Sequence, residues 1–188
     1  MTTIKLIPFL LFCATLSFGQ TTTKTGQKKP ATKTKPKVDI KVTGDWIKEK
    51  LETFSPIVYN FGKQQDELMV RTVTIDNCKL LIKDTGEGAY GYETFEIPLN
   101  DIYVPTFNSN PDWPTNMEMI FVVKSRQKNI VRKLVIYSNE SANKTEYLSQ
   151  IEIKIHKRCV EEKMTYRFKN AFTDMINSCG GSVTSDAY

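Results

Sequence analysis

One amphipathic stretch near the end of the sequence, Val160 to Cys179, limits the folds that the whole chain can adopt. Its apolar residues recur at steps of three and four, which is the spacing of one buried helical stripe. They are Met164, Phe168, Ala171, Phe172, Met175, Ile176 and Cys179. We predict one helix in which Glu161 and Glu162 occupy the positive end of the helix dipole and Gly180 ends the last turn. Because a stripe with two Phe and two Met must pack on apolar residues, this helix should cover a sheet.

The chain before this helix alternates apolar and polar residues in short stretches, which is typical of half-buried strands. The expected strands are residues 68–75 with a continuation at 78–82, then 90–99, 102–107, 117–124, 131–138 and 147–155. Asp76-Asn77 marks either a bulge in one long strand or a tight turn. Residues 117–124 and 131–138 should form a hairpin across the polar residues 125–129. Six or seven strands without helices between them predict a single, mainly antiparallel sheet or open barrel.

A short helix should precede these strands. Asp45 can cap its start and Pro56 closes it. One face carries Trp46, Ile47, Lys50, Leu51 and Phe54. We interpret Trp46 as a packing anchor, with an exposed, ligand-stacking Trp as the alternative. The predicted fold class is therefore α+β, in a single domain of residues 39–188 that has a short helix at its start and a capping helix at its end.

The first nineteen residues have the pattern of an export signal. Lys5 is the only charged residue in front of an apolar core at 6–18, and Ser17 and Gly19 are the small residues expected before a cleavage site. Cleavage there would make Gln20 the new N-terminus, and the chain would carry no transmembrane segment afterwards. We therefore expect an exported protein, periplasmic or secreted. An uncleaved helix that anchors the chain to the inner membrane is the alternative.

Residues 20–38 are predicted to be a disordered linker rich in Thr, Lys and Pro, because nothing in them can form a core. Six lysines of this linker and Lys5 account for seven of the 26 basic residues, so from Asp39 onward 19 basic residues face 21 acidic ones. A nearly neutral domain argues against specific nucleic-acid binding, which needs clustered basic charge on the domain itself. The linker itself could rest weakly on an anionic surface, although a solvated tether is the simpler interpretation.

Three of the four cysteines, Cys78, Cys159 and Cys179, remain after cleavage. An odd number in an exported chain leaves at least one thiol without an internal partner. A helix between Cys159 and Cys179 would hold them about 30 Å apart, which is too far for a disulfide. The possible internal disulfide is therefore Cys78 with Cys179, and the alternative is that both are small apolar residues in the core.

A short first helix, about seven antiparallel strands and one terminal amphipathic helix together resemble the pleckstrin-homology-like (PH-like) barrel. The segments DNCKLLIK, FEIPLNDI and FKNAFTDMINSCGG are also similar to uncharacterised exported proteins of Gram-negative bacteria. The resemblance covers roughly residues 44–181 and implies that the terminal helix covers the open end of a barrel. Many PH-like domains bind phosphoinositides or peptides. Asp84 and Glu87 stand where a basic phosphate-binding loop would follow the first strand, so lipid binding is not carried over.

Two short motifs could carry chemistry, and each has a simpler interpretation. Asp84-Thr85-Gly86 resembles the Asp-Thr-Gly of aspartic proteases, where two aspartates share one proton. A single copy followed by Glu87 is better explained as a β-turn, so Asp84 is only a weak hydrolase candidate. The glycines at 86, 88 and 91 match G-x-G-x-x-G, but a strand rather than a helix follows them. We expect these glycines to supply positive φ angles in a hairpin.

No catalytic residue, cofactor or metal site is predicted. The single histidine, His156, could combine with Cys159 into at most two metal ligands, which is too few for a zinc site. Ligand binding is assigned instead to aromatic residues near the glycine and proline loops. These are Tyr90, Tyr92, Tyr103 and Trp113, and they could equally point into a barrel core.

The function expected from the sequence is that of a non-enzymatic binding or interaction module of the cell envelope, with an unknown protein or glycan partner. A small hydrolase that uses Asp84 is one alternative. A structural subunit that pairs an exposed sheet edge with a partner strand is the other.

Overall fold

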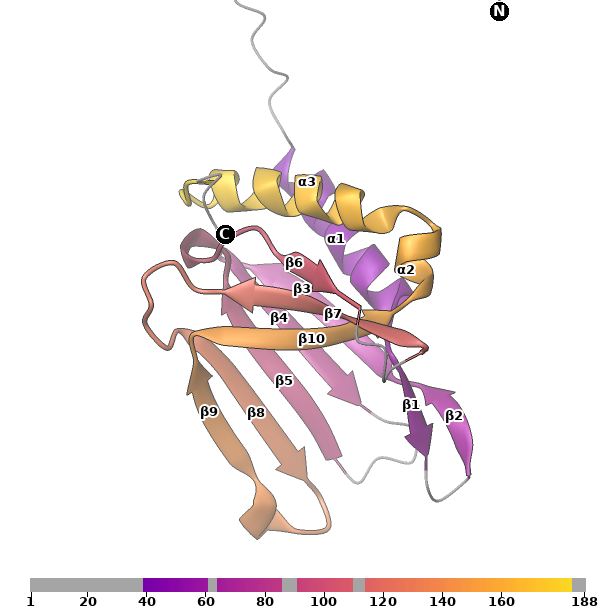
Figure 1. Ribbon diagram of the computed structural model, residues 1–188. Coiled ribbons are helices and arrows are strands. Elements are labelled where there is room, and N and C mark those ends of the chain that lie inside the picture. Colours follow the sequence, from indigo (N-terminus) through magenta and orange to yellow (C-terminus); the bar gives the residue numbers. More distant parts are fainter. Residues whose placement is uncertain (1–38, 61–63, 86–90, 110–113, 184–188) are drawn as a thin grey trace, which may run out of the picture. The chain divides into compact units, whose positions relative to one another are not determined.

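The computed structural model describes residues 39–60, 64–85, 91–109 and 114–183, so the predicted signal peptide and linker lie outside it (Figure 1). The described chain contains three α-helices, two short 3-10 helices and ten strands. In chain order they are α1 (Ile40–Thr53), β1 (Ile57–Asn60), β2 (Gln65–Leu68), β3 (Val70–Asp76), β4 (Lys79–Thr85), β5 (Gly91–Pro98), η1 (Leu99–Asp101), β6 (Thr106–Asn108), β7 (Asn116–Val122), β8 (Ile130–Ile136), η2 (Glu140–Ala142), β9 (Lys144–Leu148), β10 (Gln150–His156), α2 (Arg158–Glu161) and α3 (Met164–Ser178).

The α+β class is confirmed, and every strand pair among the described residues is antiparallel. The expected single sheet of six or seven strands is not what the structure shows. The strands form a two-stranded sheet β1-β2, a three-stranded sheet β10-β7-β6 and a five-stranded sheet β3-β4-β5-β8-β9. These sheets are not closed into a barrel.

The predicted hairpin between residues 117–124 and 131–138 is wrong. β7 pairs with β6 and β10, whereas β8 pairs with β5 and β9. Between β7 and β8 the chain passes to the other sheet through a turn in which Asp101 accepts hydrogen bonds from the Ser125 hydroxyl (2.6 Å) and the Asn129 amide (2.8 Å). The expected strand 147–155 is likewise divided at Ser149, where β9 of the five-stranded sheet ends and β10 of the three-stranded sheet follows. The three-stranded and the five-stranded sheets therefore each contain segments that are distant in the sequence.

The alternatives at Asp76-Asn77 are resolved in favour of a tight turn. β3 and β4 pair from Asp76 with Lys79 outward, so only two residues connect them. Asn77 and Cys78 have φ angles of 47° and 59°, as a two-residue turn of type I′ requires. The Cys78 carbonyl accepts the Leu99 N–H at 2.8 Å, which ties the turn to the start of η1.

The first helix is longer than expected. α1 begins at Ile40, and its N-cap is Asp39, whose side chain accepts hydrogen bonds from the N–H groups of Lys41 and Val42. Asp45, the predicted cap, is an exposed residue inside the helix that pairs with Lys41 at 2.6 Å. The error arose because both aspartates precede helix-forming residues, and only the hydrogen bonds distinguish a cap from an i,i+4 ion pair.

The terminal helical segment is interrupted. α2 ends at Glu161, Lys163 has a φ of 55°, and α3 begins at Met164. Glu161 and Glu162 therefore do not lie in the first turn of the main helix, which was the prediction. The end was predicted correctly: Gly180 has a φ of 79°, and the Gly181 N–H donates to the Ile176 carbonyl at 2.9 Å. Together with the bond from the Gly180 N–H to Asn177, this is a Schellman motif.

The predicted stripe of α3 forms the centre of the hydrophobic core. Met164, Phe168, Phe172, Met175 and Ile176 are all buried. Figure 1 shows α3 lying beside α1 and across the layer that contains β6 and β7. The Phe168 ring contacts the rings of three residues from other elements, Trp46, Phe54 and Phe107, at centroid distances of 5.3–6.5 Å. Phe172 packs edge to face on Phe121 of β7 at 5.5 Å. The helix thus joins α1 to the three-stranded sheet.

Candidate functional site

The inner face of the five-stranded sheet changes character along its strands. Residues that are paired across an antiparallel sheet point to the same side, so each row can be read from the strand register. One half of the inner face is apolar, and its rows include Val73, Ile75, Leu80, Ile82, Phe95, Ile97, Ile130 and Leu148. The charged side chains of the inner face, which we call the polar half, are Arg71, Asp84, Glu93, Arg132 and Glu146. They run diagonally, in one row on β3, β4 and β5 and in the next row on β8 and β9. The same strands therefore supply both the core and a cluster of charged side chains.

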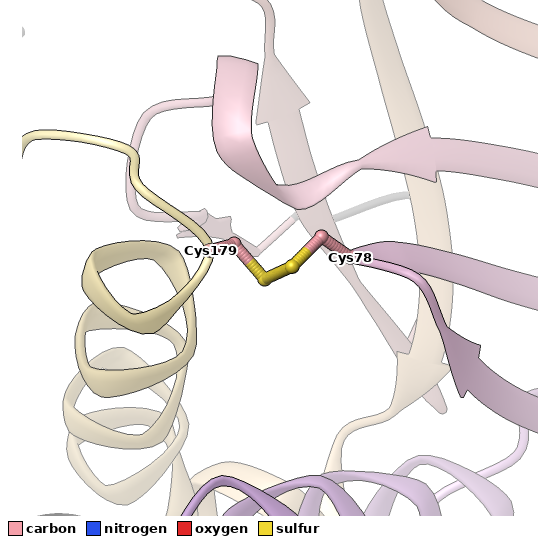
Figure 2. The surroundings of a disulfide bond; sticks show 2 residues. All are labelled: Cys78 and Cys179. Carbon is pink, nitrogen blue, oxygen red and sulfur yellow. A yellow bond between two sulfur atoms is a disulfide. The ribbon is translucent and has the colours of Figure 1, made fainter.

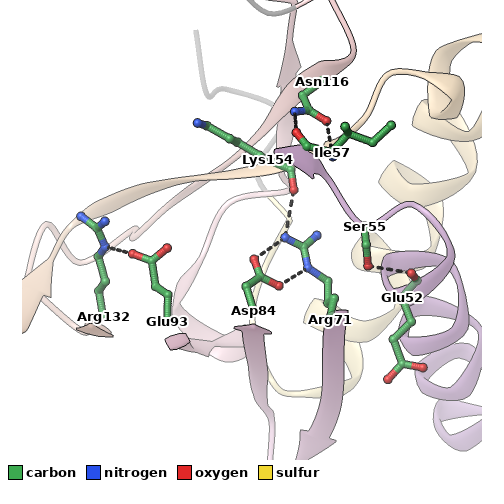
Figure 3. A network of polar contacts seen from close by, with 9 residues as sticks. All are labelled: Glu52, Ser55, Ile57, Arg71, Asp84, Glu93, Asn116, Arg132 and Lys154. Carbon is green, nitrogen blue, oxygen red and sulfur yellow. Dashed lines mark hydrogen bonds and ion pairs between the residues drawn. The ribbon is translucent and has the colours of Figure 1, made fainter. Parts of the chain in front are cut away.

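Arg71 and Asp84 are directly opposite each other on β3 and β4 and form a buried ion pair (Figure 3). Arg71 Nε and Nη2 each donate to one carboxylate oxygen of Asp84 at 2.6 Å. Nη2 also donates to the Lys154 carbonyl of β10 at 2.9 Å. The two side chains are only 0% and 6% exposed, so both charges depend on these partners for their stability. The pair also joins the five-stranded sheet to the three-stranded sheet.

A second ion-pair group lies further along the same face. Arg132 of β8 donates from Nε to Glu93 of β5 and from Nη1 to Glu146 of β9, the latter at 3.2 Å. Lys144 contacts the other oxygen of Glu146 at 2.5 Å. The Lys144 hydrogen bond, aided by the charge of Arg132, holds the pKa of Glu146 below its ordinary value. These side chains are partly exposed, and they hold each other in fixed positions without being removed from solvent.

A cavity of about 590 Å³ opens between this face and β10. We call it the intersheet cavity. Half of the residues that line it are apolar and half are polar. The apolar residues are Pro56, Val58, Met69, Phe95, Leu148 and Ile151. The polar residues are Asp84, Glu93, Arg132, Gln150, Glu152 and Lys154. Cavities that bind small molecules usually have volumes of about 300–1,000 Å³ and combine apolar walls with a few fixed polar groups. The intersheet cavity meets both conditions.

The structure does not gather the aromatic residues that were predicted to bind a ligand. Tyr90 and Trp113 lie outside the described residues. Tyr92 is the second residue of β5 and lies on the outer face, where its ring contacts Tyr137 at 5.9 Å and lies under the Lys83 ammonium at 4.2 Å. Tyr103 follows η1 at the opposite end of β5. Neither Tyr92 nor Tyr103 lines the intersheet cavity.

The Asp84 motif has a structural explanation. Both carboxylate oxygens accept hydrogen bonds from Arg71, so a buried ion pair accounts for Asp84 without a catalytic role. Gly86 and Gly88 lie outside the described residues. Gly91 does not have the positive φ that was expected of it; a Cβ on Gly91 would lie 1.8 Å from the Val135 carbonyl oxygen. Glycine is needed there because β5 and β8 approach closely.

His156 and Cys159 do not form a metal site. His156 Nδ1 accepts the Arg158 N–H at 2.9 Å, which holds the ring at the start of α2. Cys159 is a buried free thiol whose pKa is raised to about 12, mainly by burial. Among the described residues, no group of three or more His, Cys, Asp or Glu side chains is placed to hold a metal ion.

A disulfide joins Cys78 to Cys179, the pairing that the sequence left open against two buried thiols (Figure 2). The Cα atoms are 5.6 Å apart, within the range of normal disulfides. The bond fastens the C-terminal end of α3 to the β3–β4 turn. It lies at the apolar end of the sheet, away from the intersheet cavity, since Cys78 precedes the apolar rows of β4 and Asp84 follows them.

Sequence reasoning missed the intersheet cavity, although a signal for it was present. Each of β3, β4, β5 and β8 carries one charged residue among its inward-pointing positions: Arg71, Asp84, Glu93 and Arg132. The apolar members of the alternation indicate the strands, and the charged exceptions indicate the site. Charged residues that align in neighbouring strands on the core side indicate a polar site between sheets.

No helix in the described part of the chain is both long enough and apolar enough to cross a membrane. Comparison with known proteins gives no match of this chain to a family model, a curated protein or a solved structure. The site is therefore interpreted from its own geometry.

Proposed function

We propose that the chain is an exported, non-enzymatic binding module whose ligand occupies the intersheet cavity. The observation that carries the proposal is the cavity itself: about 590 Å³ of space bordered by fixed charged groups and by an apolar wall. Arg132, Glu93 and Asp84 are each held by another charged side chain. Binding would not require these groups to be reordered, so little conformational entropy would be lost at the site.

Export is supported by the Cys78–Cys179 disulfide, because structural disulfides persist mainly outside the reducing cytosol. The pattern of residues 1–19 supports the same proposal. Periplasmic and secreted locations remain equally compatible with both features. The PH-like resemblance also stays a proposal, supported by the packing of a terminal helix across antiparallel sheets.

The hydrolase alternative is the less favoured one. It rested on Asp84, and the bidentate pair with Arg71 explains that residue as part of the connection between sheets. The alternative of an envelope subunit is supported by β9, which ends the sheet order β3-β4-β5-β8-β9 and carries the exposed Tyr147.

The test is to recover the full chain from its own cells and look for a co-purifying small molecule or peptide by native mass spectrometry. Leu148→Trp places a large side chain in the wall of the intersheet cavity, whereas Tyr147→Trp changes the neighbouring, outward-pointing residue. We expect a bound mass in the unmodified protein and in Tyr147→Trp, and its loss in Leu148→Trp. An equal amount of bound ligand in all three proteins would place the binding site elsewhere.

A further inference from the structure

The intersheet cavity is bordered by the edge of a strand. β10 is the terminal strand of the sheet order β10-β7-β6. Gln150, Ile151 and Glu152 all line the cavity although they are consecutive. A strand that presented one of its faces would contribute alternate residues, so β10 borders the cavity with its hydrogen-bonding edge.

The direction of the backbone groups along this edge follows from the hydrogen bonds on both sides of β10. The Ser149 carbonyl accepts the Val123 N–H, and the Lys157 N–H donates to the Thr115 carbonyl, so both groups point toward β7. His156 donates its N–H to Phe54, and the Lys154 carbonyl accepts from Arg71, both on the opposite side. Since backbone groups alternate along an antiparallel strand, the N–H and C=O groups of Gln150 and Glu152 also point away from β7. That side is the cavity.

Backbone groups at one end of this edge have hydrogen-bond partners, and those at the other end do not. The His156 N–H donates to the Phe54 carbonyl, and the Lys154 carbonyl accepts from the Arg71 guanidinium. No backbone or side-chain group of the described residues bonds to Gln150 or Glu152 on the cavity side. A short stretch of strand edge is thus available inside a cavity that also has an apolar wall.

We propose, resting on the binding function above, that the ligand of the intersheet cavity is an extended polypeptide segment that adds to the β10 edge. Its main chain pairs with the N–H and C=O groups of Gln150 and Glu152, which gives affinity without dependence on sequence. Its alternate side chains point toward Phe95 and Leu148, which favours an apolar residue at every second position. The main chain of an extended segment presents donors and acceptors at the same spacing as these backbone groups.

The probe is a synthetic peptide, selected from a phage-displayed library of random heptapeptides on the full chain, and its dissociation constant is measured by fluorescence anisotropy. Glu152→Pro removes the N–H that points into the cavity without removing a bond to β7, and an edge strand tolerates proline in that orientation. Glu152→Ala, the matched control, removes the side chain and keeps the N–H. Both variants lose the carboxylate and only the proline variant loses the N–H, so we expect Glu152→Pro to bind about tenfold or more weakly than Glu152→Ala.

A second measurement does not depend on the folding of the proline variant. N-methylation of the selected peptide, one residue at a time, should weaken binding to the unmodified protein strongly at alternate positions and little between them. Equal affinity of Glu152→Pro and Glu152→Ala, or a peptide insensitive to N-methylation, would overturn strand addition. If no peptide is selected while a small molecule is displaced by Leu148→Trp, the peptide proposal fails and the binding function stands. If neither a peptide nor a small molecule is found, the peptide proposal and the proposed binding function both fail.

Discussion

The two halves of the inner face of the five-stranded sheet are built by the same strands, yet they have opposite relations to solvent. In the apolar half, residues such as Leu80 and Ile97 are 0% exposed beneath the helices. In the polar half, two or four residues away on the same strands, charged side chains pair with one another and border the intersheet cavity. The helices pack against the apolar half, and the disulfide lies at its end. Stability and binding are therefore separated along the strand direction, and mutations should affect them separately.

The largest loss of stability is expected from the apolar half. Phe172→Ala removes a fully buried ring that contacts Phe121 and Phe168, and such truncations cost about 3–5 kcal/mol. A urea titration measures the free energy of unfolding. Lys169→Ala on the exposed face of the same helix is the control, with an expected change of about 0.5 kcal/mol or less. Arg167, also exposed on this helix, would be a poorer control, because its guanidinium lies 5.4 Å from the Trp46 ring and its loss would remove that contact. Similar small effects from both substitutions would show that α3 is not part of the core.

The buried ion pair at the boundary between the halves comes next. Asp84→Asn leaves the Arg71 charge buried without a carboxylate and should cost up to about 4 kcal/mol. Replacing both residues together, as Arg71→Met with Asp84→Leu, removes the buried charge and should recover most of that loss. Urea titrations of Arg71→Met, Asp84→Leu and the double variant complete the double-mutant cycle that measures the coupling. A double variant no more stable than Asp84→Asn would mean that the pair does not act as a unit.

The disulfide provides a smaller effect on the apolar half. Cys78→Ser with Cys179→Ser should lower the free energy of unfolding by about 2–4 kcal/mol, because the bond closes a long loop in the unfolded chain. Dithiothreitol should destabilise the unmodified protein by a similar amount and leave the double variant unchanged. Ligand binding to the folded protein should persist, since the bond lies away from the intersheet cavity. Unaltered stability of the unmodified protein in reductant would contradict the assignment.

The smallest effect on stability is expected from the polar half. Glu93→Gln removes one partner of the partly exposed Arg132, which keeps Glu146, so stability should fall by about 1 kcal/mol or less. Binding of the selected peptide should change nonetheless, because Glu93 lines the intersheet cavity. Glu96→Gln, whose partner Lys133 lies on the outer face, is the matched control and should leave binding unchanged. A loss above about 2 kcal/mol would assign Glu93 to the core instead.

The sequence predicted local structure better than pairing. The stripe on α3 was correct because a helical period is specified by the residues themselves, and Gly180 marked the end of the helix for a similar reason. The hairpin between β7 and β8 was wrong because alternation fixes which side of a strand is buried and does not fix its neighbour. β1 and β2 were missed because β2 carries Asp66 and the buried Glu67 in place of an apolar alternation.

The binding site was harder to predict than the fold for a physical reason. The polar residues that line it come from four strands, β4, β5, β8 and β10, and meet only after the chain has passed between sheets, near Ser125 and at Ser149. The aromatic residues chosen from the sequence were grouped by their distance along the chain. In the structure Tyr92 and Tyr103 lie at opposite ends of β5.

The 101-residue separation of Cys78 and Cys179 has a consequence for how the chain matures. A polypeptide emerges from its N-terminal side first, so Cys78 appears long before its partner, and Cys159 appears in between. The first cysteine that follows Cys78 along the chain is therefore Cys159, which is not its partner in the folded protein. Cys159 is withdrawn from this competition when β10 and α2 fold, since its thiol is then buried and its pKa of about 12 leaves almost no reactive thiolate. The order in which segments fold thus decides which of two bonds the chain can make.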